Sequence, residues 1–69
     1  MGRQRLRVGI AGYGVVGKRR RQFIDVNPAM ITVAVSDKSF EKAGTGPDGV
    51  KFYPSYQDLF SEKLDVLFV

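Results

Sequence analysis

The chain has 69 residues, a net charge of +4, and neither cysteine nor histidine. A chain of this size forms at most one small domain, which buries only about 60% of its extended surface and is therefore marginally stable. Without cysteine or histidine there is no disulfide framework, thiolate metal site or imidazole base, so we expect no metal centre and a reducing, cytoplasmic location.

The amino-terminal part also resembles a secretory signal, with a basic start and a small apolar run over residues 8–17. Four basic residues, 18–21, follow this run where a cleavage site should stand, and no stretch is long enough to span a membrane. We therefore expect a soluble protein.

The first predicted element is a strand over residues 6–10, because Leu6, Val8 and Ile10 alternate with polar or small residues. Gly9 implies that the other face of this strand is closely covered.

A helix is predicted from residue 15 to about residue 26, because Val16, Phe23 and Ile24 lie near one helical stripe. The dipeptide Asn27-Pro28 ends it, since the residue before a proline is pushed out of the helical region. Arg20 is expected to fold its stem over the sheet. The other polar residues of the helix are expected to face water: Lys18, Arg19, Arg21, Gln22 and Asp25.

A second strand is predicted over residues 31–36, which are β-branched and apolar enough for a buried parallel strand. Residues 38–49 are the least regular segment because three glycines and a proline break local order, although a helical turn at 39–43 fits the sequence.

A short third strand is predicted over residues 50–53. Ser55 then caps a helical segment whose buried side is expected to carry Leu59 and Phe60. Residues 64–69 are predicted to form a fourth strand. The aromatic residues are spread singly over these elements, which favours core packing over a stacking platform for bases: Phe23, Phe40, Phe52, Tyr53, Tyr56, Phe60 and Phe68.

The most informative stretch lies between the first strand and the first helix and reads Gly12-Tyr13-Gly14-Val15-Val16-Gly17. This is the glycine pattern of a dinucleotide-binding turn, in which the first glycine takes a conformation that Cβ forbids, the second admits a pyrophosphate, and the third lets helix and strand touch. The helix dipole and the unpaired N–H groups of the first turn favour the phosphates. Tyr13 lies in the turn, where its side chain can flank the cofactor.

The second part of this pattern is an acidic residue about twenty positions further on. Asp37 ends the second strand and follows Gly17 by 20 positions (37 − 17 = 20). A carboxylate there accepts hydrogen bonds from the adenosine ribose and repels a 2′-phosphate, which favours NAD over NADP; the adjacent Lys38 leaves NADP open. The alternative role of Asp37 is that of a turn residue at the strand end.

Together these features predict an α/β fold, a partial Rossmann parallel sheet of about four strands in the order 3-2-1-4. Residues 1–69 would form the amino-terminal half of a dinucleotide-binding domain, without a substrate domain. The fourth strand would be an edge, and because Val66–Val69 is apolar we expect it to pair with another chain or a second copy.

Three segments, Val8–Gly17, Val33–Asp37 and Tyr53–Phe60, together with Leu64–Val69, resemble the amino-terminal region of the Gfo/Idh/MocA oxidoreductases, the glucose-fructose oxidoreductase and inositol dehydrogenase-like enzymes. The resemblance implies a Rossmann domain that binds NAD or NADP and passes hydride to or from a sugar, polyol or related substrate held by a second domain. It implies no catalytic residue here, because the family's Glu-Lys-Pro motif lies beyond the next strand. It implies these cofactor contacts: Gly12, Tyr13, Gly14, Val15, Val16, Asp37 and, beside the adenosine, Lys38.

Three other interpretations stay open. An archaeal-type glyceraldehyde-phosphate dehydrogenase also begins with a Gly-Tyr-Gly turn and a Gly-Lys-Arg step. The basic residues Arg3 to Arg7 and Lys18 to Arg21 could serve a module that binds nucleic acid or another polyanion. The apolar edge strand could instead make the chain a non-catalytic assembly piece.

Overall fold

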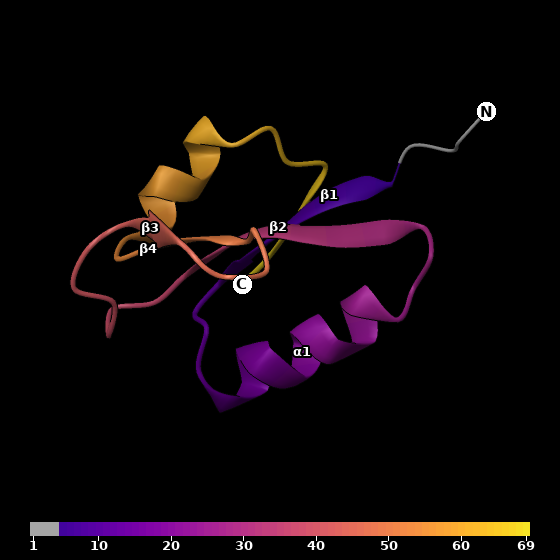
Figure 1. Ribbon diagram of the computed structural model, residues 1–69, viewed down its shortest axis with the longest axis horizontal. Helices are drawn as coiled ribbons and strands as arrows, with labels where there is room; N and C mark the ends of the chain where they lie inside the picture. The colour runs from indigo at the N-terminus through magenta and orange to yellow at the C-terminus, as the bar shows by residue number, and fades with distance from the viewer. Residues whose placement is uncertain (1–4) are drawn as a thin grey trace.

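The computed structural model describes residues 5–69, which form one five-stranded sheet with an α-helix on one face and a 3₁₀ helix on the other (Figure 1). Arg3, one of the basic residues considered above, lies outside this range. In chain order the elements are β1 (Leu6–Ala11), α1 (Val15–Asp25), β2 (Met30–Ser36), β3 (Gly44–Thr45), β4 (Lys51–Tyr53), the 3₁₀ helix η1 (Tyr56–Ser61) and β5 (Val66–Phe68).

The sheet has the strand order β3-β4-β2-β1-β5. The neighbours β4 and β2, β2 and β1, and β1 and β5 are parallel, whereas β3 is antiparallel to β4. The fold is therefore α/β with a mixed, mostly parallel sheet, and β5 lies at one edge as the sequence predicts. Because β1, β2, β4 and β5 run in the same direction, their carboxyl ends lie at one side of the molecule.

The prediction of about four strands is wrong by one, because β3 forms within the segment expected to be irregular. Gly44 and Thr45 pair with Phe52 and Lys51 of β4. A Cβ at Gly44 would lie 2.7 Å from Cζ of Phe52, so the phenyl ring packs against a backbone that has no side chain there. This strand depends on tertiary packing, because it has only two residues and glycine is depleted in strands.

The helical turn at 39–43 is also wrong. The backbone turns after β2, where the amide of Phe40 donates to the carbonyl of Asp37 at 3.1 Å. The Asp37 side chain stabilises this turn because its Oδ1 accepts from the amide of Ser39 at 3.0 Å. The Phe40 ring then packs on Phe52, with centroids 5.3 Å apart, and draws the segment onto the sheet.

Helix α1 packs on the sheet through Gly17 and Ile24, which are its buried residues. Two residues of the predicted apolar stripe are exposed instead, Val16 at 70% and Phe23 at 76%. The reason is the close contact of Gly17 with the carbonyl of Gly12, which sets the rotation of the helix about its axis. Val16 and Phe23 each precede a buried residue by one position, or about 100° of helix rotation, and therefore face outward.

A β-bulge in β2 brings two residues of that strand to α1. The register with β1 shifts between Val8 and Gly9, which pair with Thr32 and Ala34 and leave Val33 as the extra residue. The hydroxyl of Thr32 consequently donates to Oδ1 of Asp25 on α1 at 3.0 Å. Val35, three positions later, also joins the core under α1, which further contains Val8, Ile10 and Ile24.

The opposite face of the sheet is covered by η1 and the segment that follows it. Leu59 is fully buried there, as predicted, but Phe60 is 67% exposed, so its predicted burial is wrong. The prediction that the second face of β1 is closely covered near Gly9 is confirmed, since a Cβ there would lie 2.5 Å from Cδ1 of Leu64. Ser55 caps η1 as predicted, because its hydroxyl accepts from the amide of Gln57 at 3.2 Å.

Candidate functional site

The turn between β1 and α1 is fastened to the end of β2. The amides of Gly12 and Tyr13 both donate to the carbonyl of Ser36, each at 2.9 Å. Gly12 has a φ of +89°, a left-handed conformation that disfavours any residue with a Cβ. The first glycine of the pattern is thus required by the backbone of the turn itself.

The other two glycines of the turn differ from each other. A Cβ at Gly17 would collide with the carbonyl oxygen of Gly12, so the third glycine is required for α1 to pack against the turn. A Cβ at Gly14 would meet no protein atom within 4 Å, and the φ of Gly14 is an ordinary −90°. Packing within the described residues therefore does not require a glycine at position 14, and the space beside it is open.

The amino terminus of α1 is left without a side-chain cap. Gly14 occupies the N-cap position, no side chain accepts from the first-turn amides, and the first turn has no acidic residue. The amide of Lys18 makes the first bond of the helix, to the carbonyl of Gly14 at 2.9 Å. The N–H groups before Lys18 and the positive end of the helix dipole thus favour an anion at this end of the sheet.

Asp37 lies at the same end of the sheet, directly after β2. Its amide donates to the carbonyl of Tyr53 at 3.0 Å, which holds the turn against the end of β4. Its Oδ1 accepts from Ser39, whereas Oδ2 has no hydrogen-bond partner among residues 5–69. Asp37 is therefore a turn residue at the end of the strand, which is one of the two roles that the sequence predicts. It is also a half-buried carboxylate whose Oδ2 can accept a further hydrogen bond.

A groove of about 760 Å³ connects the glycine turn with Asp37. It runs along the carboxyl ends of β1, β2, β4 and β5, which is where ligands bind in open parallel sheets. Its lining is mostly apolar, and Asp37 and Lys38 are the charged residues in it. The lining residues are Ala11, Gly12, Ser36, Asp37, Lys38, Pro54, Ser55, Tyr56, Phe60, Leu67 and Val69.

Only part of the predicted site lines this groove. Gly12, Asp37 and Lys38 do so, whereas Val16 and Gly17 line a smaller hollow of about 190 Å³ beside the edge strand β5. The two hollows share Ala11, Gly12 and Val69, so they flank the glycine turn from opposite faces of the sheet. Gly14 and Val15 are exposed at the start of α1 and line neither hollow.

The side chain of Tyr13 packs toward α1 and away from the groove. Its hydroxyl accepts from Nη1 of Arg21 at 3.0 Å, and its ring lies 6.5 Å from that of Phe40. Arg21 also forms ion pairs with Asp25, at 3.1 Å, and with Asp48. The prediction that Arg21 faces water is wrong, because its side chain is only 19% exposed and connects the glycine turn, α1 and the segment before β4.

The electrostatics of this cluster favour the charged forms. Partial burial opposes the charge of Arg21, but the hydrogen bonds that Arg21 donates to Asp48 and Tyr13 outweigh it and raise the pKa of Arg21 above its ordinary value. The same bond from Arg21 lowers the pKa of Asp48. Arg21 therefore holds the turn in place as a permanent cation.

A second polar cluster joins the end of η1 to the sheet. The hydroxyl of Tyr53 donates to Oε2 of Glu62 at 2.5 Å, and Nζ of Lys51 lies 3.5 Å from the same oxygen. Arg7 completes the cluster at 3.9 Å from Oε1. The bond from Tyr53, followed by the charge of Lys51, lowers the pKa of Glu62, and the bond to Glu62 raises the pKa of Tyr53.

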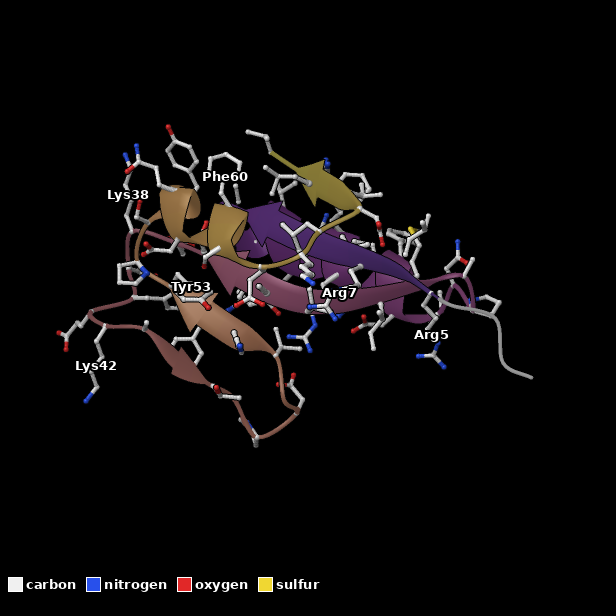
Figure 2. The ribbon with its side chains drawn as sticks, turned by 90° about the horizontal axis from the view of Figure 1, so that it is seen from above. Arg5, Arg7, Lys38, Lys42, Tyr53 and Phe60 are labelled. Atoms are coloured by element: carbon white, nitrogen blue, oxygen red, sulfur yellow. The ribbon has the colours of Figure 1, made fainter. Side chains whose placement is uncertain are left out.

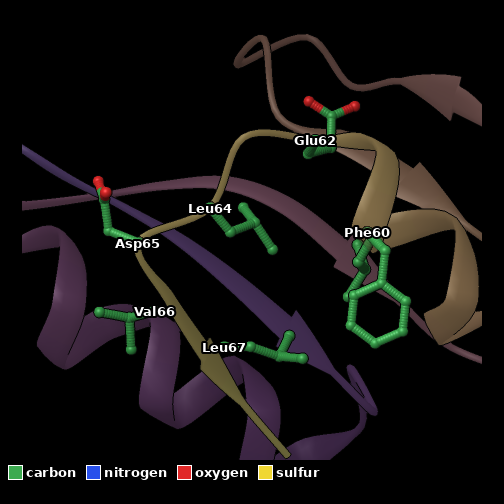
Figure 3. Close-up of a pocket in the computed structure, with 7 residues that line it drawn as sticks. Phe60, Glu62, Leu64, Asp65, Val66 and Leu67 are labelled. Carbon is green, nitrogen blue, oxygen red and sulfur yellow. The ribbon is translucent and has the colours of Figure 1, made fainter.

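A small cavity of about 280 Å³ lies between η1 and β5, next to the groove (Figure 3). Leu67 extends from β5 toward Phe60 of η1, and both residues also line the groove. The side of the groove formed by η1 therefore lies against this cavity, whose apolar lining also contains Leu59 and Leu64.

The aromatic wall of the groove consists of two residues that the sequence predicts in the core. Core packing is the prediction for Tyr56 and Phe60, and it is wrong, because they are 55% and 67% exposed and line the groove. Phe23 is exposed as well, and the other four aromatic residues are half-buried, as core packing requires: Phe40, Phe52, Tyr53 and Phe68. The available signal was the position of Tyr56 just after a parallel strand, where side chains reach the carboxyl edge of the sheet.

The basic residues are distributed over separate parts of the surface. Arg5 lies at the opposite end of the sheet from Lys38 (Figure 2). Arg7 is engaged by Glu62 and donates from Nε to the carbonyl of Lys63 at 2.5 Å. The guanidinium of Arg20 lies 5.1 Å from the centre of the Phe68 ring, so this side chain folds over the sheet as expected.

No protein-family model, curated protein or solved structure matches this chain. Within residues 5–69, no helix is long and apolar enough to cross a membrane. The same residues contain no group of three or more acidic side chains arranged to hold a metal ion.

Proposed function

We propose that this chain binds a nicotinamide adenine dinucleotide, NAD or NADP, in the groove at the carboxyl ends of its parallel strands. It would serve as the NAD(P)-binding portion of an oxidoreductase. Any hydride transfer to or from a sugar, polyol or related substrate belongs, by resemblance to Gfo/Idh/MocA enzymes, to residues outside this chain, and we assign no catalytic residue within it. A glyceraldehyde-phosphate dehydrogenase-like parent is compatible with the same cofactor site.

The single observation that carries the proposal is the different geometry at the three glycines. A turn that only joined a strand to a helix would need Gly12 for its positive φ and Gly17 for its close contact. Nothing in the described structure requires a glycine at position 14, where the space is open. A bound pyrophosphate does require one, because it must approach the backbone at the amino terminus of α1.

The position of Asp37 supports the same ligand. It lines the groove together with Gly12, and its Oδ2 is available to accept hydrogen bonds. A ribose at Asp37 would lie in the groove itself, and phosphates at the start of α1 would lie beside the glycine turn, whose Gly12 lines the groove, in the order that the adenosine half of a dinucleotide requires. The carboxylate favours the 2′-hydroxyl of NAD, and Lys38 beside it keeps NADP as the second ligand.

The strand order supports a Rossmann-type topology when β3 is set aside. The four parallel strands then follow the order β4-β2-β1-β5, which corresponds to 3-2-1-4 when they are counted along the chain. This is the arrangement of the first half of a dinucleotide-binding sheet, with the nucleotide crossing the carboxyl ends of its central strands.

Calorimetric titration of the purified chain with NAD and NADP tests the proposal. We expect saturable binding, stronger for NAD, that is weakened by Gly14→Ala and by Asp37→Ala. Glu41→Ala is the matched control, since Glu41 is an exposed carboxylate that does not line the groove. The proposal is wrong if wild-type protein with a cooperative unfolding transition binds neither dinucleotide.

A second candidate function is assembly through the edge strand. β5 pairs only with β1 among the described strands, and Val69 beside it is 94% exposed. Apolar edges of this kind pair with other strands. Light scattering over a range of concentrations tests this function: a mass that rises toward two chains supports it, and a mass of one chain throughout refutes self-pairing.

A further inference from the structure

Two large aromatic side chains of η1 are exposed on the wall of the groove. Tyr56 and Phe60 are separated by four positions, and their ring centroids are 6.3 Å apart at an angle of 83°, an edge-to-face pair. η1 buries Leu59 completely between them. These two rings therefore do not fill the core, and together they present an aromatic surface to the groove.

The same groove is also lined by Asp37 and Lys38. Figure 2 shows Lys38 and Phe60 at the same end of the molecule, far from Arg5. The groove is mostly apolar and open to solvent, and its charged lining residues are Asp37 and Lys38. Such a site suits a flat heteroaromatic ring, because its faces can lie on apolar side chains while its edges remain accessible to polar groups.

We propose that Tyr56, supported by Phe60, is the surface on which the adenine ring of the nucleotide stacks. This inference rests on the function proposed above and extends it to residues outside the glycine pattern. An exposed aromatic face binds a base by stacking, with little need for hydrogen bonds to a particular base edge.

The strand order decides which half of the dinucleotide reaches these rings. Tyr56 follows β4, and β4 lies beside β2, whose end carries Asp37. Tyr56 and Asp37 are therefore on the same side of the glycine turn, away from β5. The base attached to the ribose at Asp37 is the one that can reach Tyr56, and in a dinucleotide bound with its phosphates at α1 that base is adenine.

The test compares AMP, which contains only the adenine half, with nicotinamide mononucleotide, which contains only the other half. Titrations use the full chain and the variants Tyr56→Ala, Tyr56→Phe and Phe23→Ala. Phe23→Ala is the matched control, because it removes an aromatic ring that is also exposed, at 76% against 55% for Tyr56, from α1 on the opposite face of the sheet. Circular dichroism verifies that each variant is folded.

We expect Tyr56→Ala to weaken AMP and NAD by the same factor, roughly 5- to 150-fold, the range for loss of one stacked base. Tyr56→Phe retains the aromatic face and should keep AMP affinity within about twofold. Phe23→Ala should bind like wild type. None of the three should alter the weaker binding of nicotinamide mononucleotide.

Fluorescence supplies an independent measurement, because the chain has three tyrosines and no tryptophan. Stacking of adenine on Tyr56 should quench tyrosine emission after correction for ligand absorbance. Tyr56→Phe should lose most of this quenching although its affinity is kept. A variant that merely disturbed the structure would lose both together.

The possible results separate the inference from the function on which it rests. If wild type binds NAD and AMP but Tyr56→Ala binds both with unchanged affinity, the stacking role is wrong and the cofactor site stands. If Tyr56→Ala weakens nicotinamide mononucleotide as much as AMP, the assignment to adenine is wrong. If folded wild type binds neither NAD nor AMP, both the inference and the function are overturned.

Discussion

Replacement of Gly17 by alanine tests the packing that orients the glycine turn. A Cβ at this position would collide with the carbonyl oxygen of Gly12 and lie 3.5 Å from Cγ2 of Ile10. The carbonyl belongs to a backbone held by two hydrogen bonds to Ser36, so it cannot move aside as a flexible side chain would. Helix α1 must therefore shift away from the sheet, and Ile24 with it.

The magnitude follows from two opposing effects. Overpacking of a tightly packed site costs about 1–3 kcal/mol. Alanine is favoured over glycine inside a helix by up to about 1 kcal/mol, and by less in the first turn, where Gly17 lies. The net loss in the free energy of unfolding should be about 1–2 kcal/mol. This is a large share of the roughly 3–10 kcal/mol expected for a domain of this length.

Thermal and urea unfolding measure this loss, which corresponds to a decrease in Tm of roughly 4–16 °C for a domain of this size. Arg19→Ala is the control, because Arg19 is exposed on the same helix and its loss should change stability by no more than about 0.5 kcal/mol. Gly17→Val should cost more than Gly17→Ala. The reasoning is refuted if Gly17→Ala unfolds at or above the wild-type midpoint.

Three further predictions follow from the packing and the polar clusters. Leu59→Ala should lose about 2–5 kcal/mol because the side chain is fully buried, whereas Phe60→Ala should lose less than about 1 kcal/mol; equal losses in urea unfolding would contradict the observed burial. The bond from Tyr53 lowers the pKa of Glu62 in the folded state, so its stabilisation is present above the unfolded pKa of about 4.3 and is lost as the pH falls through the lower folded value. Wild type should therefore lose more stability between about pH 6 and about pH 3.5 than Glu62→Gln does, and parallel pH profiles would show that Glu62 has no such role. Arg21→Ala should lower the free energy of unfolding by about 1–2 kcal/mol, because loss of the guanidinium leaves Asp25, Asp48 and Tyr13 without their partner. The same unfolding assay measures this loss, and a loss no greater than that of Arg19→Ala would refute a stabilising role for Arg21.

The main strands and the helix could be predicted because each has a local cause. Alternation of apolar residues predicts β1, the β-branched run predicts β2, and Asn27-Pro28 marks the end of α1 to within a turn. Strand β3 could not be predicted, since it has only two residues and one of them, Gly44, disfavours a strand. It pairs with β4 because the Phe52 ring packs on the bare backbone of Gly44.

The rotation of α1 and of η1 about their own axes could not be predicted from the sequence either. A stripe of apolar residues on α1 is compatible with several rotations, and the contact of Gly17 with Gly12 selects the one that exposes Val16 and Phe23. On η1, the adjacent residues Leu59 and Phe60 are equally apolar, and only packing against the sheet buries the first and exposes the second.

In the candidate site, the glycine turn and Asp37 could be predicted from the sequence, because the number of residues between them is set by one helix and one strand. The sequence did not connect them with Tyr56 and Phe60, since the residues that follow β4 reach the groove only once β4 has paired beside β2. Tyr13 is the converse case: a residue adjacent in sequence to the turn whose side chain packs toward Arg21.

The sequence by itself determined the α/β class, the strand–turn–helix unit and the glycine and acidic positions, because each depends on local backbone preferences and on short-range spacing. The tertiary structure alone decided the fifth strand, the rotation of α1 and the aromatic wall of the groove. The physical reason is that these features arise from contacts between segments distant along the chain, where the close approach of one backbone or ring selects among arrangements that the local sequence leaves equal in free energy.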